Sequence, residues 1–347
     1  MAIPDHPYPV LIGEGVLALL PQLLATHTGA AVVADRAASG FAGVLDAPLL
    51  EVDAGEGLKS LEGAGAVFDF LERTGIDRSG CLVAIGGGTV GDLAGFAAAT
   101  WLRGVALYQV PTTLLAMVDS AIGGKTGINT ALGKNRIGAF WQPSAVVADL
   151  RALDTLAEEE VRGGFGEVVK YGLAMDRELL ARVTERAGPL LARSPPELEA
   201  VVARCAALKA RSVAADERDL TGARAVLNYG HTAGHALETA SGYSLQHGRA
   251  VAHGMRVAAR LARALGLVGD EVVRAHDGAL ARFGLPGRLP AAIDLEEILR
   301  ALPRDKKAVG GEPAWILPLA IGEVAPGRPV AGAAVREVLA RYLEEAS

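Results

Sequence analysis

The histidines of this chain gather in one short stretch, which is the first sign of chemistry. Three of the seven histidines are His231, His235 and His247. His231 and His235 are four residues apart, so a helix would place them on one face, and this spacing favours both as metal ligands. A third, acidic ligand is available in a Gly-rich segment at Glu167. Two histidines and one carboxylate, with one coordination position left open, are typical of catalytic rather than structural zinc.

The other histidines lie outside any motif. His6, His27 and His276 receive no role from the sequence. His253 follows His247 by more than one helical turn, and we expect it on the surface of a helix.

The lysines are few and are not scattered. The chain holds seven lysines against twenty-seven arginines, and only three asparagines. Arginine cannot replace lysine where a compact point charge or a removable proton is needed, so the remaining lysines point to a site. Six of them stand in Gly-rich segments, before the histidine stretch or near the end of the chain: Lys125, Lys134, Lys170, Lys209, Lys306 and Lys307. Chance could explain the position of any one of these lysines but is a poor explanation for all of them. We therefore expect the set to bind a small anionic substrate.

A glycine-rich turn indicates a second kind of site. Residues 86–92 read Gly-Gly-Gly-Thr-Val-Gly-Asp and lie between an expected strand and an expected helix. They contain Gly-x-Gly-x-x-Gly at Gly86, Gly88 and Gly91, which lets backbone amides at a helix N-terminus approach a pyrophosphate. No acid stands about 20 residues downstream, where the usual ribose partner lies, although Asp35 could serve instead. We predict dinucleotide binding without the standard Rossmann topology; the alternative is a tight turn with no ligand.

Lys125 stands in a further glycine loop, Gly-Gly-Lys-Thr-Gly at residues 123–127. A phosphate-binding P-loop would need its first glycine at position 119, which is Asp119, so the nucleotide-triphosphatase interpretation fails. A lysine on a glycine loop still suits a phosphate or a carboxylate.

Short apolar runs alternate with helical stretches over residues 1 to about 155, as they do in βαβ units. Strands are expected over 30–35, 81–85, 105–110 and 145–149, and helices over 64–73 and 93–102. From about residue 156 the pattern becomes helical with few strand signals, over 177–192, 197–215, 249–265 and 269–283. We predict an α/β fold with a Rossmann-like NAD-binding domain, residues 1–155, and a mainly α-helical metal- and substrate-binding domain, residues 156–347. The cleft between them is the default site.

Composition excludes several classes of function. The net charge of −6 argues against nucleic acid or an anionic membrane as a partner. No apolar run approaches the length of a membrane span, and the first ten residues have no apolar signal core. The two cysteines, Cys81 and Cys205, form no Cys-x-x-Cys motif and suit buried thiols in a reducing compartment. We expect a cytoplasmic protein.

Taken together, these motifs resemble those of the 3-dehydroquinate synthase family in one order along most of the chain. The matching runs are residues 86–92, Val110-Pro-Thr-Thr-Leu-Leu, Val118-Asp-Ser-Ala-Ile-Gly-Gly-Lys-Thr-Gly-Ile-Asn, Gly133-Lys-Asn, Gly166-Glu-Val-Val-Lys-Tyr-Gly, Leu227-Asn-Tyr-Gly-His-Thr-Ala-Gly-His-Ala-Leu-Glu and His247-Gly-Arg-Ala-Val-Ala-His-Gly-Met. The resemblance implies a carbon–oxygen lyase of the shikimate pathway, which leads to chorismate and the aromatic amino acids. Its substrate would be 3-deoxy-D-arabino-heptulosonate 7-phosphate (DAHP), cyclised to 3-dehydroquinate with loss of phosphate. Its cofactors would be catalytic NAD and Zn²⁺ or Co²⁺.

The resemblance also assigns roles by position. It makes Glu167, His231 and His247 the metal ligands, and moves His235 to the substrate. The implied catalytic residues are Lys125, Lys170, His235, Asn228 and Asp119, and the implied substrate-binding residues are Arg103, Lys209, Arg224 and Lys306, with Lys307 as the alternative to Lys306. The implied NAD-binding residues are Asp35, Glu56, Lys59, Gly88, Thr89, Val90, Gly91, Asp92, Thr112, Thr113, Lys125, Lys134, Asn135, Ala152, Leu153, Asp154 and Thr155. Arg103 matches an arginine that reaches the neighbouring subunit's substrate, which implies a homodimer.

Three other functions compete with this one. A different sugar phosphate cyclase would share much of the site. An iron-type polyol dehydrogenase would share the architecture but would accumulate NADH and have little use for so many lysines. A non-catalytic metal or nucleotide sensor would need neither an open metal position nor phosphate-binding lysines.

Overall fold

The chain folds into two compact units. The computed structural model describes residues 6–131, 133–290, 293–302 and 314–346, so the predicted substrate residue Lys306 and its alternative Lys307 lie outside the described residues. Unit 1 comprises Met1–Val161 and Arg193–Arg218, and unit 2 comprises Arg162–Ala192 and Asp219–Ser347. The sequence placed one boundary near residue 155. The packing instead returns Arg193–Arg218 to unit 1, because helix α7 (Pro195–Ala215) packs on strand β1 and turn η5 of that unit.

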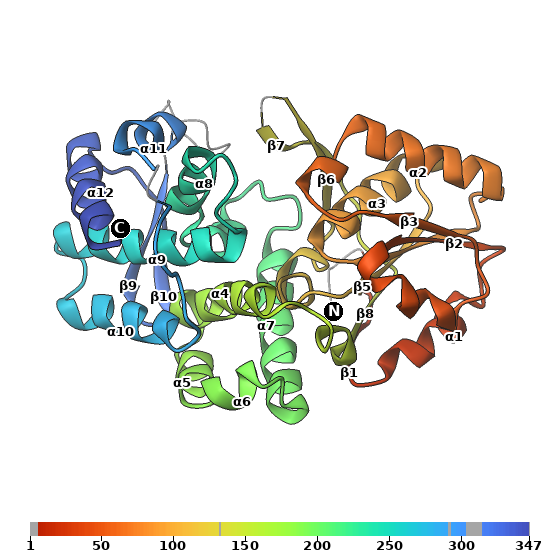
Figure 1. Ribbon diagram of the computed structural model, residues 1–347, viewed down its shortest axis with the longest axis horizontal. Helices are drawn as coiled ribbons and strands as arrows, with labels where there is room; N and C mark the ends of the chain where they lie inside the picture. Colours follow the sequence, from red (N-terminus) through yellow and green to blue (C-terminus); the bar gives the residue numbers. More distant parts are fainter. Residues whose placement is uncertain (1–5, 132, 291–292, 303–313, 347) are drawn as a thin grey trace. The chain divides into compact units, whose positions relative to one another are not determined.

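Unit 1 is built on a six-stranded parallel sheet (Figure 1). The strands, in spatial order, are β1 (Val10–Gly13), β8 (Ala145–Asp149), β5 (Ala106–Pro111), β4 (Cys81–Gly86), β2 (Ala30–Asp35) and β3 (Leu49–Val52). The predicted α/β class and all four predicted strands are confirmed. When the six strands of this sheet are numbered 1 to 6 along the chain, so that β8 becomes strand 6, their order across the sheet is 1-6-5-4-2-3. This differs from the 3-2-1-4-5-6 order of standard dinucleotide-binding folds.

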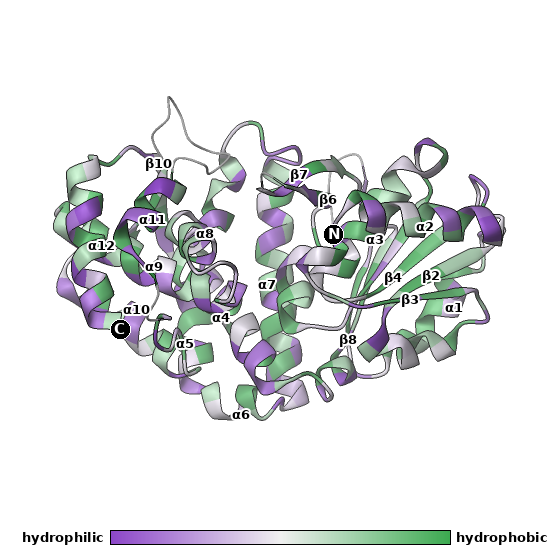
Figure 2. Cartoon of the chain, turned by 45° about the horizontal axis from the view of Figure 1, so that its top comes forward, coloured by the Kyte–Doolittle hydropathy of each residue, from purple (hydrophilic) through white to green (hydrophobic). Residues whose placement is uncertain are grey.

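Both faces of this sheet are buried, which explains why its strands read as continuous apolar runs. Along β2, Val33 packs with helices α2 (Leu61–Thr74) and α3 (Gly88–Thr100), whereas its neighbour Val32 packs on the opposite face. That face is covered by η1 (Val16–Leu19), α1 (Leu20–Leu24) and η2 (Arg36–Val44). Figure 2 shows β2, β3 and β4 as largely hydrophobic between helices whose outer faces are polar. The sheet therefore forms a rigid base whose carboxyl edge carries loops.

Smaller elements complete unit 1. They are the turns η3 (Glu56–Leu58), η4 (Trp101–Arg103), η5 (Ala116–Ser120) and η6 (Leu150–Leu153), and the antiparallel hairpin of β6 (Lys125–Thr130) and β7 (Gly133–Phe140). η5 is one turn of π-helix, a form that occurs mostly as single turns and frequently at functional sites.

Unit 2 is mainly helical, as predicted. Its helices are α4 (Glu158–Met175, which begins just inside unit 1), α5 (Arg177–Glu185), α6 (Ala187–Leu191), α8 (His231–Ala240), α9 (His247–Ala264), α10 (Asp270–Ala281), α11 (Leu295–Ala301) and α12 (Gly332–Ala346), with a turn η7 (Ala223–Asn228). Helix α9 lies at the centre and packs against α8, α10, α12 and strand β9. The antiparallel hairpin of β9 (Trp315–Ala320) and β10 (Glu323–Arg328) was not predicted from the sequence.

Helices α4, α8 and α9 approach one another through glycines. A Cβ added at Gly248, in the first turn of α9, would lie 2.0 Å from the carbonyl oxygen of Gly163 in α4. A Cβ added at Gly254, further along α9, would lie 1.8 Å from the carbonyl oxygen of Gly230, which precedes α8. Backbone cannot yield as a side chain can, so any larger residue must push the helices apart. These contacts fix the distances between three helices that also carry the candidate metal ligands.

We expect Gly248→Ala to lower the free energy of unfolding by about 1–3 kcal/mol, because the added methyl group forces α9 away from α4. Gly278→Ala in α10 is the matched control, since an added Cβ there meets nothing within 4 Å. That change should raise the free energy of unfolding by roughly 0.5–1 kcal/mol through helix propensity alone. Urea unfolding of both variants measures the difference, and equal shifts of the same sign would show that the glycine contact is not a constraint.

Candidate metal and substrate site

Three side chains from three helices of unit 2 meet at one point. Glu167 lies within α4, while His231 and His247 are the first residues of α8 and α9. Glu167 Oε1 lies 3.6 Å from His231 Nε2 and 3.5 Å from His247 Nε2. One ligand atom from each of the three residues lies within 4.8 Å of the others. The backbone contacts at glycines bring α4, α8 and α9 close together, so these three side chains converge although they are far apart in the sequence.

Glu167 is fully buried, yet its position favours the charged form. Oε1 is buried without a hydrogen bond of ordinary geometry. Burial opposes ionisation, but the ammonium of Lys170 and the imidazoles of His231 and His247 together hold the pKa of Glu167 well below its usual value. A buried oxygen that faces two imidazole nitrogens and accepts no good hydrogen bond fits a divalent cation, and the donor set suits zinc or cobalt.

His247 has a second carboxylate on its far side. Its Nδ1 lies 3.5 Å from Glu238 Oε1, and Glu238 is buried in α8. Burial lowers the pKa of His247, but the nearby carboxylates of Glu167 and Glu238 outweigh it and raise that pKa to about 10. A carboxylate behind a metal-binding imidazole commonly orients the ring and increases its basicity. Glu238 is thus a functional candidate that the sequence analysis missed, although it ends a motif that was noticed.

His235 lies at the rim of this cluster. It is exposed, with its ring centroid 5.2 Å from that of His231 and 6.1 Å from that of His247. Among the described residues, the two groups able to hold a metal are Glu167 with His231 and His247, and His235 with Glu238 and His247. Neither group contains His231 and His235 together, so the pairing suggested by their helical spacing is not found.

The other predicted residues of unit 2 lie close by in the chain. Lys170 is buried one helical turn after Glu167, forms an ion pair with Glu167 Oε2 and donates to the carbonyl of Leu227 at 2.8 Å. Asn228 follows Leu227, and its Nδ2 donates to the carbonyl of Ala225. Arg224 is buried in the same turn, η7. Lys170 therefore connects the candidate ligand Glu167 to the segment that leads into α8.

In unit 1, most of the predicted NAD-binding residues follow five strands of the sheet at their carboxyl ends, whereas Lys125, Lys134 and Asn135 lie on the hairpin of β6 and β7. Asp35 ends β2; Glu56 and Lys59 follow β3; residues 88–92 follow β4; Thr112 and Thr113 follow β5; and residues 152–155 follow β8. Carboxyl ends of parallel strands share one edge of the sheet, which is where such folds bind their ligands. The structure thus brings residues scattered over 120 positions to one edge.

A partly buried ion pair joins the segment after β3 to the first turns of helix α3. Lys59 Nζ lies 2.6 Å from Asp92 Oδ2 and also donates to Asn135 Oδ1. Burial raises the pKa of Asp92, and the Lys59 charge opposes that rise. Lys134 Nζ lies 3.7 Å from Glu56 Oε1. A pocket of about 400 Å³ adjoins them, with Glu56 and Lys59 in its lining.

The glycines of the predicted dinucleotide turn are needed for packing. A Cβ at Gly91 would lie 2.7 Å from Gln109 Oε1, and one at Gly88 would lie 2.9 Å from Ser120 Oγ. These contacts keep the N-terminus of α3 close to the sheet, as a pyrophosphate-binding turn requires.

Lys209 and Asp119 form a separate pair in unit 1. Lys209, near the end of α7, donates to the backbone carbonyl of Asp119 at 2.6 Å and forms an ion pair with its carboxylate. Lys125 begins β6 and is exposed. Arg103 is exposed at the end of η4, where Leu102 and Arg103 both adopt left-handed backbone conformations.

One prediction about the remaining histidines is wrong. His253 is fully buried rather than exposed, and its Nδ1 lies 2.6 Å from the hydroxyl of Tyr342 in α12. Helix α9 is covered by neighbours on several sides, so its periodicity does not mark an outer face.

Comparison with known sequences identifies relatives along the whole chain. The sequence profile of the 3-dehydroquinate synthase N-terminal family matches residues 49–163, and that of the C-terminal family matches residues 164–308. A 3-dehydroquinate synthase of Symbiobacterium thermophilum is 44% identical over 97% of this chain and 98% of its own length. A 3-dehydroquinate synthase of Opitutus terrae is 48% identical over 83% of this chain and 81% of its own length.

Solved structures share the fold. A 2-deoxy-scyllo-inosose synthase in complex with carbaglucose-6-phosphate, NAD⁺ and Co²⁺ has a TM-score of 0.88 at 28% identity, covering 97% of both chains. A 2-epi-5-epi-valiolone synthase of Streptomyces hygroscopicus with NAD⁺ and Zn²⁺ bound has a TM-score of 0.89 at 26% identity, covering 99% of both chains. A probable glycerol dehydrogenase of Sinorhizobium meliloti, at 17% identity and a TM-score of 0.67, covering 98% of this chain and 97% of its own, shares the fold alone.

We expect metal binding at pH 7 to release about one proton, because the metal must displace the proton on His247. The pKa of His247 is about 10 without metal, whereas burial lowers that of His231 to about 3, so His231 has no proton to lose. Apparent affinity for Zn²⁺ should therefore rise about tenfold per pH unit between pH 6 and 8. Calorimetric titration in buffers of different ionisation enthalpy measures the released proton.

Glu238→Gln provides the control, because it removes one of the two carboxylates that hold this proton. The variant should release less than wild type at pH 8. If wild type releases no proton at pH 7, His247 is neutral before the metal arrives and this account of its charge is wrong.

Proposed function

The chain belongs to the 3-dehydroquinate synthase family, and we propose that Glu167, His231 and His247 form the metal centre at which it converts DAHP to 3-dehydroquinate and phosphate. The enzyme is a carbon–oxygen lyase of the shikimate pathway that uses catalytic NAD and a divalent metal, Zn²⁺ or Co²⁺. The observation that carries the proposed metal set is the buried carboxylate oxygen of Glu167, which faces two imidazole nitrogens at 3.5 and 3.6 Å.

NAD, when bound, supplies reversible hydride acceptance, and the metal supplies polarisation of a substrate oxygen. For NAD we propose the carboxyl edge of the sheet in unit 1. The support for this assignment is the close turn at Gly88 and Gly91, together with a pocket of about 400 Å³ lined in part by Glu56 and Lys59. Lys59 also pairs with Asp92 of the glycine-rich turn.

The remaining side chains would orient the substrate and move protons. Lys170 is held by Glu167 and the carbonyl of Leu227, so its charge is fixed in place and suits a substrate oxygen. His235 is exposed beside the proposed ligands, which suits proton exchange with the substrate and water. Asn228 and Arg224 lie in the turn before α8 and would bind hydroxyl and anionic groups. In unit 1, we propose substrate roles for Lys125, Asp119 and Lys209.

A different sugar phosphate cyclase activity is the second candidate. The favouring observation is that solved cyclases with other products match at TM-scores of 0.88 and 0.89. Their identity to this chain is 28% and 26%, whereas the 3-dehydroquinate synthases reach 44% and 48%. We therefore expect DAHP to be the substrate, with glucose 6-phosphate as the comparison compound.

A homodimer belongs to the same proposal. Arg103 would reach the substrate bound by the partner subunit. Its support is the exposed position of Arg103 at the end of η4, where two consecutive left-handed residues turn the chain sharply.

We also propose a cytoplasmic location, which suits the two buried thiols, Cys81 and Cys205. No helix among the described residues is long and apolar enough to cross a membrane.

The activity assay supplies DAHP with substoichiometric NAD and Zn²⁺ or Co²⁺. We expect phosphate release without net formation of NADH, and no phosphate release when glucose 6-phosphate replaces DAHP. NADH formed in proportion to substrate would instead indicate a dehydrogenase, and release from glucose 6-phosphate alone would indicate the other cyclase activity.

We expect His247→Ala to lose bound metal and turnover while NAD still binds, because the NAD-binding residues we propose are all in unit 1. Metal content, phosphate release and NAD titration measure the three effects. His6→Ala changes an exposed histidine outside the site and should leave all three unchanged. Retained turnover in His247→Ala would remove His247 from the metal set.

The dimer is tested by mixing two inactive variants, Arg103→Ala and Glu167→Ala. A mixed dimer has one site with an intact Glu167 from one chain and an intact Arg103 from the other. After denaturation and refolding at equal amounts, activity should recover to about a quarter of wild type, since half the dimers are mixed and each has one complete site. No recovery, with mixed dimers demonstrated, would mean that Arg103 does not act across the interface.

A further inference from the structure

A buried histidine that the sequence left without a role has both ring nitrogens engaged. His276 lies in α10, and its Nδ1 is 2.7 Å from the carbonyl oxygen of Val272. A carbonyl only accepts, so Nδ1 carries the ring proton and Nε2 offers a lone pair. The hydroxyl of Tyr229 donates to that Nε2 at 2.5 Å, with the two rings edge to face. The tautomer of His276 is therefore fixed by the backbone of its own helix.

Tyr229 connects this histidine to a proposed metal ligand. It is fully buried and lies two residues before His231. The backbone carbonyl of Tyr229 accepts from Nδ1 of His231 at 3.2 Å. Nδ1 of His231 therefore carries the proton, and its Nε2, the nitrogen 3.6 Å from Glu167 Oε1, is left with the lone pair that a metal needs.

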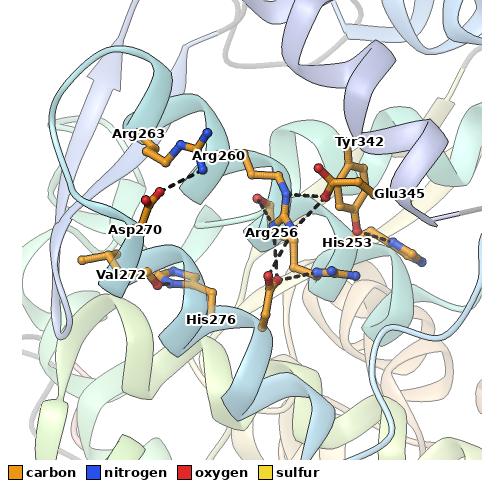
Figure 3. A network of polar contacts seen from close by, with 10 residues as sticks. His253, Arg256, Arg260, Arg263, Asp270, Val272, His276, Tyr342 and Glu345 are labelled. Carbon is orange, nitrogen blue, oxygen red and sulfur yellow. Dashed lines mark hydrogen bonds and ion pairs between the residues drawn. The ribbon is translucent and has the colours of Figure 1, made fainter.

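The position of α10 is itself fixed by charge. Asp277, next to His276, lies 2.6 Å from Arg256 Nε and 3.0 Å from Arg260 Nη2. Arg256 and Arg260 belong to α9, the helix that begins with His247, and Arg260 also pairs with Glu345 of α12 at 2.9 Å. Figure 3 shows these arginines between α10 and Tyr342 and Glu345 of α12. His276 is thus held against a rigid group of helices.

We propose that Tyr229 and His276 form a positioning pair that fixes the tautomer and the orientation of His231 for metal binding. The inference rests on the proposed metal set. Neither residue touches the metal position; they act through the carbonyl of Tyr229. Burying two polar side chains is unfavourable unless their polar groups are hydrogen-bonded. Here both ring nitrogens of His276 and the hydroxyl of Tyr229 have partners.

The protein contains matched controls for this pair. His253 and Tyr342 form a similar buried pair in unit 2, with ring centroids 5.8 Å apart against 5.9 Å for His276 and Tyr229. Tyr342→Phe therefore removes a comparable hydrogen bond in the same unit, while the phenyl ring that remains can still pack against Arg256 and Arg260. A general loss of stability would affect both pairs alike, whereas positioning of the ligand involves Tyr229 and His276 alone.

The test measures Zn²⁺ affinity by chelator competition and the visible absorption of the Co²⁺-loaded protein, with urea unfolding of the metal-free protein alongside. Tyr229→Phe and His276→Leu should each weaken Zn²⁺ binding about tenfold and change the Co²⁺ spectrum. His276→Gln should restore most of the affinity, because its amide oxygen can accept from the Tyr229 hydroxyl in place of Nε2. Tyr342→Phe should lower stability to a similar extent while leaving Zn²⁺ affinity within twofold of wild type.

Wild-type affinity and spectrum in Tyr229→Phe would overturn the proposal, and this variant keeps the aromatic ring should His276→Leu fail to fold. Equal weakening in Tyr342→Phe would overturn it as well, because the effect would then be one of general stability. Glu167→Ala separates the two proposals. It should abolish Zn²⁺ binding, and if it does so while the pair variants bind normally, the metal set stands and the positioning pair falls. If Glu167→Ala still binds Zn²⁺ as wild type does, the metal set itself is wrong.

Discussion

Close backbone contact between α4, α8 and α9 is the constraint on which the proposed metal centre depends. The contacts at Gly248 and Gly254 leave no space for a side chain, so the helices meet at a distance that no other residue permits. Each of these helices contributes one candidate ligand. His231 and His247 stand at helix starts, where the direction of the chain is set by the residue before them, and Gly230 supplies a left-handed conformation at the start of α8.

The proposed sites also contain buried or partly buried carboxylates, and in each unit a lysine offsets the carboxylate charge. In unit 2 the carboxylate of Glu167 is offset by Lys170, with two imidazoles beside it. In unit 1 the carboxylate of Asp92 is offset by Lys59. Isolated buried charges are strongly unfavourable, and pairing makes them tolerable without making them strongly stabilising. Such pairs are better explained by binding chemistry than by stability, which agrees with their place among the candidate site residues.

The sequence predicted the sheet of unit 1 well because strands buried on both faces leave a local signal, as in Cys81–Gly86. It missed both edge strands, β1 and β3, and both hairpins, β6–β7 and β9–β10; in β3, exposed Leu49 alternates with half-buried Leu50. The candidate site was harder. Glu167 and His247 are 80 positions apart, and local spacing instead favoured His235, four residues from His231. Resemblance to a family, rather than helical spacing, replaced His235 by His247 in the set that converges. The role of Tyr229 and His276 had no local signal, since it arises from the packing of α10 beside the segment before α8.

The two-sided burial of the unit 1 sheet has a consequence for how such proteins diverge. Strands β2, β4 and β5 contribute side chains to two hydrophobic clusters, one on each face of the sheet. Because both clusters are closely packed, a change in one side chain requires changes in its neighbours. The segments after β2, β3, β4, β5 and β8 carry most of the predicted NAD-binding residues. Mutations in these segments mainly affect what the protein binds, whereas mutations in the strands mainly affect whether it folds. A lineage can therefore acquire new ligand preferences at one edge of the sheet while inheriting an unchanged scaffold.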